Sequence, residues 1–334
     1  MAVAQSGGVA GLITAATGRP VEIVGVTTLG DVSREQLTQI GGTGIFVSAL
    51  RESLLRGDVD FAVHSLKDLP TAAAPGIALA AIPARDDPRD ALVGRDGAKL
   101  ADLPPGARIG TGSPRRAAQI MTLRSDVVCV PIRGNANTRL AKVRDGEFDA
   151  VVLAYAGLAR IGHTDLVSEI FEPEAMVPAP GQGALAVECR ADDTVLGELL
   201  ARVDHPATRA AVTAERSLLG ALEAGCSAPV GAYAFSPAGT GRLHLEGIVL
   251  GAPAVTAGGG STFGGAAELS PATATFLPGA LDSATPGGRM VIRERGEADA
   301  ADAERLGREL AGRMLALGAA GLMRAEETNR NDAA

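Results

Sequence analysis

The sequence predicts an α/β protein with two similar lobes built on mainly parallel sheets, followed by a third α+β domain. Three observations support this: a repeated helix–strand–helix–strand pattern, a Pro-rich segment that returns to strand and helix pattern, and a change of character after residue 206. Of the 334 residues, 46% are hydrophobic and 21% are charged, which is typical of globular domains. The length suffices for two or three domains with a core each.

The repeat is clearest in RGDVDFAV at 56–63 and RDGEFDAVV at 144–152. Glycine, acid and a short β-branched run predict the end of a helix followed by a buried parallel strand. Matching units at 20–31 and 126–135 predict a further strand and turn before each of them. Strands that alternate with helices favour parallel sheets, so we expect two lobes of similar fold.

Only the second copy of the repeat has an opening unit, ARIGTGSPRR at 107–116. It predicts a strand at 108–110, a glycine-containing turn, and a helix with Pro114 at its first position, where proline is favoured. The first copy starts with MAVAQSG, already inside a helix. We therefore expect domain 1 to lack its opening strand and anion-binding turn, through a start assigned too late or a shortened form.

The later part of the chain predicts a different unit. After the Pro-rich MVPAPGQG, residues 181–200 resume strand and helix pattern and are expected to return to the first lobe. A helix at 207–223 and strands near 230–235 and 243–250 follow. The last helix is amphipathic, with one apolar face formed by Leu306, Leu310, Met314 and Leu317.

These patterns predict three domains joined by hinges. We expect the hinges near 84–90 and 178–184. The predicted divisions are 1–84 with 184–203 for domain 1, 85–183 for domain 2, 206–322 for domain 3 with a loose Gly-rich insertion at 251–288, and 323–334 as a disordered tail.

Composition excludes several classes of protein. A net charge of −8, only 3% aromatic residues and no Trp argue against nucleic acid as the partner. The sequence contains no run of 18 apolar residues and no secretory pattern, so we expect no membrane span and a cytoplasmic monomer. Cys129, Cys189 and Cys226 lack zinc-site or disulfide spacing, and we expect no metal. Cys129 and Cys189 lie in apolar runs and are predicted core residues.

HSLKDLP at 64–70 follows a predicted buried strand. Ligands of open α/β sheets bind at the carboxyl ends of strands, so Lys67 and Asp68 are candidates for a substrate site. A carboxylate there can move a proton or stabilise a developing cation. A solvated pair of turn residues is the alternative.

A basic segment extends from Arg108 to Arg160, with nine basic and four acidic residues and a local net charge of +5. This predicts a site for an anionic small molecule. Its first part, GTGSPRR, offers a helix N-terminus for an anion, although an ordinary helix cap is the alternative. The side chains that would take part are Thr111, Ser113, Arg115 and Arg116.

Further candidates lie at other strand ends and in a late loop. Arg133, Asn135, Arg139 and Arg160 can together hold a polycarboxylate, since each charge-assisted hydrogen bond contributes about 1.5–3 kcal/mol. Cys226 lies in a Gly/Ser/Pro loop, where a thiolate can react or form an attachment; an incidental small residue is the alternative.

Taken together, these segments resemble the porphobilinogen deaminases, also called hydroxymethylbilane synthases. The resemblance covers nearly the whole chain and includes VHSLKDLP, IGTGSPRRAAQI, IRGNANTRLAKV, PAPGQGALAVECR and LEAGCSAPVGAYA. It implies two lobes like those of periplasmic binding proteins and a third domain with the cofactor cysteine. It also implies a transferase of tetrapyrrole (haem) biosynthesis, which condenses four porphobilinogens head to tail and releases ammonia at each step.

The resemblance also implies roles for individual residues. The catalytic residues would be Asp68 and Lys67, and a dipyrromethane cofactor would be bound to Cys226 through a thioether. The remaining cofactor-binding positions would be Lys67, Ser65, Thr111, Ser113, Arg115, Arg116, Arg133, Asn135, Arg139 and Gln182, and the substrate-binding positions Arg133, Arg139, Arg160 and Phe46.

Two other functions stay open at this point. One is an inactive, N-terminally truncated deaminase, since the family normally opens with a strand and turn that this sequence lacks. The other is a noncatalytic bilobed protein that binds a small carboxylate. The absence of a phosphate loop or dinucleotide fingerprint disfavours a nucleotide-dependent enzyme.

Overall fold

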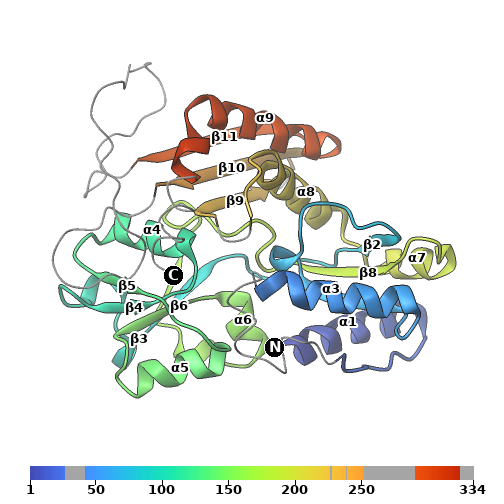
Figure 1. The fold of residues 1–334 in the computed structure, drawn as a ribbon, viewed down its shortest axis with the longest axis horizontal. Coiled ribbons are helices and arrows are strands. Elements are labelled where there is room, and N and C mark those ends of the chain that lie inside the picture. Colours follow the sequence, from blue (N-terminus) through green and yellow to red (C-terminus); the bar gives the residue numbers. More distant parts are fainter. Residues whose placement is uncertain (27–41, 226–227, 238, 252–289, 324–334) are drawn as a thin grey trace.

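The fold is known from a computed structural model, which describes residues 1–26, 42–225, 228–237, 239–251 and 290–323, with side chains from residue 47 onward in the second range. Three sheets with their covering helices form three units (Figure 1). We call them lobe one, lobe two and the third unit. None of the helices within these ranges is both long and apolar enough to cross a bilayer.

Lobe one contains a three-stranded sheet in the order β1-β8-β2. Both pairings are antiparallel, and β8 enters between the two earlier strands from much later in the sequence. In Figure 1, the yellow-green β8 and α7 therefore lie among blue elements. The elements are β1 (Phe61–Ser65), β2 (Ile77–Ala81), β8 (Leu185–Arg190), α1 (Ala2–Thr17), α3 (Gly42–Arg56) and α7 (Thr194–Leu200).

The strand expected at 20–31 is not formed in its described part, residues 20–26; residues 27–31 lie outside the described ranges. Ile23 and Val24 are 48% and 55% exposed. A β-branched run forms a strand only when a neighbouring strand pairs with it. Among the described residues, no such neighbour lies beside this segment.

Lobe two contains a five-stranded sheet in the order β5-β4-β6-β3-β7. β4 is parallel to both of its neighbours, whereas β3 is antiparallel to β6 and β7. The α/β class is confirmed, and the strand pairing is more mixed than the repeat indicates. The elements are β3 (Asp90–Gly94), β4 (Arg108–Gly110), β5 (Val128–Val130), β6 (Ala150–Ala154), β7 (Glu169–Phe171), α4 (Pro114–Leu123), α5 (Ala136–Arg144) and α6 (Tyr155–Arg160).

Several local predictions in lobe two are confirmed. The strand at 108–110 is β4, and Pro114 opens α4. Cys129 of β5 and Cys189 of β8 are 2% and 1% exposed, as expected for core residues. The apolar positions of β3 and β6 are buried on both faces, because helices and neighbouring strands enclose them.

The third unit is an antiparallel sheet, β11-β10-β9, covered by two packed helices. The predicted helix and the two predicted strands are confirmed, whereas β11 was not predicted. The elements are α8 (Pro206–Ala221), β9 (Val230–Phe235), β10 (Arg242–Leu250), β11 (Val291–Asp299) and α9 (Ala303–Ala316).

The prediction of the apolar face of α9 is confirmed at three positions and wrong at one. Leu306, Leu310 and Met314 are at most 3% exposed, but Leu317 is 37% exposed. Leu317 follows the last helical residue, and Gly318 then turns the backbone through a positive φ, so the helical period no longer applies to it. The predicted insertion and tail lie almost entirely outside the described residues.

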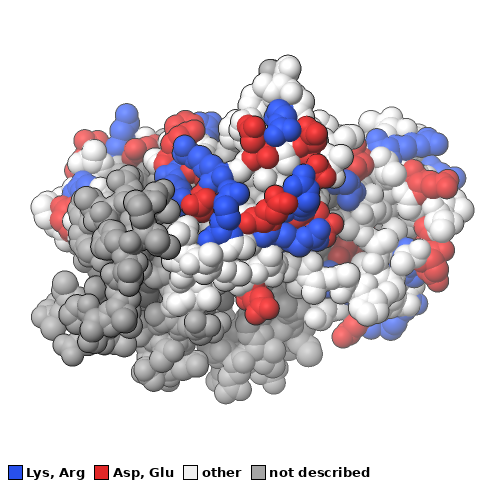
Figure 2. Space-filling model, turned by 90° about the horizontal axis from the view of Figure 1, so that it is seen from above, with Lys and Arg blue, Asp and Glu red and all other residues white. Residues whose placement is uncertain are grey.

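Charged side chains of both signs alternate on the face seen from above (Figure 2). On α9, Arg305 pairs with Glu309 and Arg308 with Glu304, each one helical turn apart. Such exposed pairs contribute little stability. On the described part of this face, no single-sign patch suggests a polyanion-binding surface.

Two chain segments connect lobe one and lobe two, and they touch each other at Gly183. This residue has a φ of +87°, and a Cβ there would lie 2.5 Å from the backbone oxygen of Asp86 in the other connection. Glycine is therefore required both by its backbone angle and by the close approach. The lobes are thus linked by two connections in direct contact.

Helix α8 of the third unit holds both connections. Its Glu215 is fully buried and accepts hydrogen bonds from Arg85 of the first connection and from the backbone N–H of Gly181 in the second. Arg85 also donates to the backbone oxygen of Gln182 at 2.7 Å. The third unit therefore fixes the region where the lobes meet.

Candidate functional site

Lys67 and Asp68 lie on a short 3-10 turn, Leu66–Asp68, directly after β1. Both side chains are half-buried, while Leu66 is fully buried beneath them. From α8, Arg216 donates to the backbone oxygens of Leu66, Leu69 and Pro70 at 3.3, 2.8 and 2.7 Å. The turn therefore has a fixed shape, set in part by a helix that is distant in sequence.

Arg115 and Arg116, which we call the inner arginines, are only 2% and 6% exposed. Arg115 Nη2 lies 2.8 Å from Asp90 Oδ2, and Arg116 Nη2 lies 2.7 Å from Asp90 Oδ1. Arg115 also donates to the backbone oxygen of Val177, and Arg116 to that of Val152. Their guanidinium groups are thus anchored inside the protein and do not project freely from the helix terminus.

Asp90 is the carboxylate that balances this pair, and it is fully buried at the start of β3. Burial alone would raise its pKa, but the charges of Arg115 and Arg116 outweigh burial and hold the pKa at about 2. Asp90 is therefore ionised at neutral pH.

Gln182 connects this cluster to the lysine. It is fully buried, and its Oε1 accepts from Lys67 Nζ at 3.4 Å and from Arg116 Nη2 at 3.3 Å. Burial, aided by the charge of Arg116, lowers the pKa of Lys67 to about 8. The structure therefore brings together Lys67, Asp68, Gln182 and the inner arginines, which are widely separated in sequence.

Thr111 and Ser113 shape the turn before α4. Thr111 is fully buried, and its hydroxyl accepts from Ser113 N at 3.2 Å. Ser113 caps α4 by accepting from Arg116 N at 3.4 Å. Ser113 thus makes the helix-cap contact that was the alternative to anion binding, while Thr111 stabilises the turn before it, and Ser113 remains half-buried.

Arg133 and Arg139, the outer arginines, lie after β5 and on α5. Arg133 is exposed and Arg139 half-buried. Arg139 donates to the backbone oxygen of Gly134 at 2.8 Å, and burial together with the charge of Arg116 lowers its pKa. Asn135 is exposed and caps α5 through Thr138 N at 3.0 Å. Arg139 therefore lies close enough to Arg116 to feel its charge, and Arg133 is open to solvent.

Other candidates differ in their placement. Ser65 accepts from Gln5 Nε2 of α1 at 2.7 Å, just before the lysine turn. Arg160 donates to Asp86 at 2.8 Å and to the backbone oxygen of Gly183 at 2.7 Å, so it is bound to the two connections. Cys226 and the Phe46 side chain lie outside the described residues.

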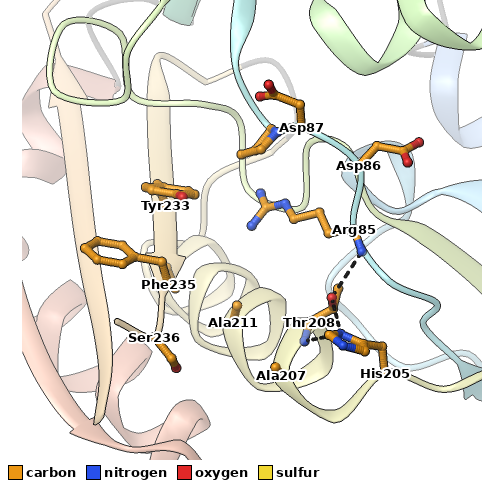
Figure 3. A pocket seen from close by; sticks show the side chains of 12 residues that line it. Arg85, Asp86, Asp87, His205, Ala207, Thr208, Ala211, Tyr233, Phe235 and Ser236 are labelled. Carbon is orange, nitrogen blue, oxygen red and sulfur yellow. Dashed lines mark hydrogen bonds between the residues drawn. The ribbon is translucent and has the colours of Figure 1, made fainter. Parts of the chain in front are cut away.

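A separate pocket lies between the first connection, the start of α8 and β9 (Figure 3). Tyr233 and Phe235 form one wall, and Arg85 and Thr208 face them. It contains none of the predicted site residues. Its charged lining groups already have protein partners: Arg85 with Glu215, Asp86 with Arg160, and Asp87 with Arg89.

Comparisons with known proteins bear directly on this arrangement. Residues 1–198 match the family described as porphobilinogen deaminase, dipyromethane cofactor binding domain, and residues 209–256 match porphobilinogen deaminase, C-terminal domain. The chain belongs to the porphobilinogen deaminase family. The predicted family and its dipyrromethane cofactor domain are therefore confirmed.

Curated relatives agree with this membership. The porphobilinogen deaminase of Thermobifida fusca is 58% identical over 88% of this chain and 89% of its own. Porphobilinogen deaminase 1 of Streptomyces coelicolor is 54% identical over 97% and 94%. The family members are enzymes, and their shared name includes the substrate porphobilinogen.

Solved structures of low similarity were also found. An arginine-specific periplasmic binding protein of Salmonella typhimurium is 14% identical, with a TM-score of 0.33 over 59% of this chain and 80% of that one. A putative sulfonate-binding protein of Methylobacillus flagellatus is 16% identical, with a TM-score of 0.33 over 66% and 63%. These TM-scores are too low to assign a fold or a ligand.

The described site fits a ligand with several carboxylates. Three cationic side chains, Lys67, Arg115 and Arg116, face two carboxylates, Asp68 and Asp90. Within the described part of the chain, Arg115 Nε is a buried N–H with no hydrogen-bond acceptor. Exposed Arg133 and half-buried Arg139 add charge at the edge. This donor set suits a ligand with several carboxylate groups.

Sequence reasoning missed Asp90, Glu215 and Arg216, which organise the site. Asp90 opens the strand DALVG, all five residues of which are buried. An acid at the start of such a strand, near a cluster of arginines, could have indicated a buried counter-ion. No local pattern marks Arg216, because its three acceptors are backbone oxygens of a distant turn.

Proposed function

We propose that this chain is a hydroxymethylbilane synthase, a transferase that joins four porphobilinogens head to tail and releases ammonia at each step. The observation that supports this best is the meeting of the Lys67–Asp68 turn with the inner arginines through Gln182. A cation-rich site with one adjacent carboxylate suits a substrate that brings two carboxylates and becomes a cation when ammonia leaves.

The arginines would bind and orient the carboxylates. Arg133 and Arg139 are the accessible donors, so we assign the incoming substrate to them, together with Phe46 by family resemblance. The inner arginines supply a fixed positive potential, since Asp90 anchors their guanidinium groups. Arg160 would act through the connections to which it is bound.

Asp68 would stabilise the positive charge that develops on the substrate pyrrole as ammonia departs. Its half-buried position on a fixed turn limits reorganisation during the reaction. Lys67 beside it can donate a hydrogen bond to a carboxylate or exchange a proton, because its pKa of about 8 lies near neutral pH. Ser65, Thr111, Ser113 and Asn135 complete the proposed cofactor-binding set, to which Gln182 belongs through its support of Lys67 and Arg116.

Cys226 is the proposed attachment point of the cofactor through a thioether. The dipyrromethane, when bound, supplies the pyrrole carbon to which the first substrate is joined. The cysteine holds the growing chain covalently, and movement between the lobes can bring successive rings past one catalytic turn. The two connections in contact at Gly183 are the proposed hinges.

We further propose the domain division given by the sequence, 1–84 with 184–203, 85–183 and 206–322. The three sheets support it, since each takes its described strands from one of these divisions. A cytoplasmic monomer remains our proposal for the state of the enzyme.

Intact-protein mass spectrometry tests the proposed function. The purified chain should be heavier than its sequence by two deaminated porphobilinogen units, and Cys226→Ser should lack this excess. Cys129→Ala is the matched control, because Cys129 is a buried core residue, and it should retain the excess. A chain without any adduct that still binds a small carboxylate would instead be a binding protein or an inactive deaminase.

A further inference from the structure

Gln182 lies where the lysine turn, the inner arginines and the first connection meet. Its Oε1 accepts from Lys67 Nζ and Arg116 Nη2, at 3.4 and 3.3 Å. Its Nε2 donates to Asp90 Oδ1 at 2.9 Å and to the backbone oxygen of Pro88 at 2.7 Å. All four hydrogen-bonding positions of the amide are thus used, so this fully buried side chain has one orientation.

Asp90 fixes the other end of the same chain of contacts. It accepts from Gln182 Nε2 and Arg116 Nε at the same oxygen, each at 2.9 Å, and its second oxygen pairs with Arg115. A shift of Asp90 would therefore change the position of both inner arginines and of the amide that contacts the lysine.

We infer that Asp90 and Gln182 are positioning residues, which hold the Lys67 amine of lobe one against the inner arginines of lobe two and thereby set the charge that this amine presents to the substrate. The inference rests on the proposed function, because it places the Lys67 amine in that reaction site. Neither residue needs to touch a reacting atom.

The electrostatics around the amine give the direction of the effect. Burial lowers the pKa of Lys67, the charges of Arg116 and Arg115 lower it further, and Asp68 and Asp90 oppose them, for a pKa of about 8. Removal of the Asp90 charge should therefore lower this pKa. Removal of the Gln182 amide should also lower it, because the protonated amine loses a hydrogen-bond acceptor.

The test is the pH dependence of lysine acylation in the full purified chain, read by peptide mass spectrometry. The chain has three lysines, at positions 67, 99 and 142, so exposed Lys99 and ion-paired Lys142 serve as references in each digest. Lys67 should reach half of its maximal reactivity near pH 8, well below the ordinary lysine pKa of 10.5. A Lys67 midpoint at the ordinary lysine value of 10.5 in the unsubstituted chain would overturn the inference, even if neither variant folds.

Asp90→Asn and Gln182→Met should each lower the Lys67 midpoint. For each pH unit by which the Lys67 midpoint falls, the neutral fraction of the amine rises about tenfold at pH values well below the midpoint. The control is Asp165→Asn, which removes a charge from an exposed position of the same lobe and should leave the midpoint unchanged. Gln182→Met keeps the length of the side chain. If Asp90→Asn does not fold, the Lys67 midpoint of Gln182→Met alone tests the inference.

An unchanged midpoint in either folded variant would contradict the inference. Acylation requires no turnover and no adduct, so this result is independent of the mass measurement that tests the proposed function. In active variants, the pH profile of kcat should move in the same direction as the Lys67 midpoint. A purely structural role of Asp90 or Gln182 would change the amount of folded enzyme and leave both pH midpoints in place.

Discussion

The inner and outer arginines come from the same basic segment but occupy opposite environments. Arg115 and Arg116 are 2% and 6% exposed and are bound to Asp90, whereas Arg133 is exposed and Arg139 half-buried. A buried cation needs a buried partner, so the inner pair is part of the folded framework. An accessible guanidinium keeps its donors for a ligand. Residue type alone does not tell a binding arginine from a structural one.

Replacement of the Asp90 carboxylate should have the largest effect on stability. Asp90→Asn leaves two buried guanidinium groups without a counter-charge, which should cost about 3–5 kcal/mol of unfolding free energy. Urea unfolding measures this, with Asp165→Asn as the exposed control that should change by less than about 0.5 kcal/mol. Equal losses in the two variants would contradict the framework role of the inner pair.

Loss of an outer arginine should affect the reaction and spare the fold. Arg133→Ala or Arg139→Ala removes a charge-assisted hydrogen bond worth about 1.5–3 kcal/mol, so kcat/KM should fall roughly 10- to 100-fold. Arg144→Ala on the same helix is the control, since Arg144 pairs only with neighbouring Asp145 among the described residues. A loss of unfolding free energy without a loss of activity would reverse the assigned roles.

Acid should destabilise the protein through the inner cluster. The pKa of Asp90 is depressed to about 2, so the stability that it contributes is present above its unfolded pKa of about 4 and is lost as pH falls towards 2. This contribution is about 2 kcal/mol. Glu188 of β8 should behave in the same way, because contacts with His64 and Arg51 hold its pKa at about 2 against the effect of burial.

Unfolding curves between pH 6 and 2 check the sign of this effect. Asp90→Asn should lose less stability over that interval than the unsubstituted chain, whereas Arg133→Ala should follow the unsubstituted chain. An acid dependence that is equally steep in Asp90→Asn would exclude Asp90 as its source.

The two helix caps should give the smallest effects. Ser113 caps α4 beside the inner arginines, and Asn135 caps α5 beside the outer ones. Ser113→Ala and Asn135→Ala should each cost about 0.5–2 kcal/mol of unfolding free energy. Since Ser113 and Asn135 are also proposed cofactor ligands, reduced adduct formation at unchanged stability would show that ligand binding is their main role.

Several elements of the fold and the family could be predicted from the residues alone. Periodicity and turn residues predicted β4, α4, α8, β9 and β10, because local patterns of apolar residues, glycine and proline report local backbone preference. The ordered motifs determined the family and the dipyrromethane domain, which the comparisons confirmed. The predicted role of each site residue stays a proposal.

Which charges are anchored and which are accessible follows from the folded arrangement and could not be predicted from local patterns. The segment at 20–26 has strand-forming residues but no strand, since pairing depends on a neighbour. The inner arginines are buried because Asp90, 25 residues earlier than Arg115 in sequence, meets them inside lobe two. Electrostatic energy depends on distance and burial, and residues far apart in sequence acquire both only when the chain has folded.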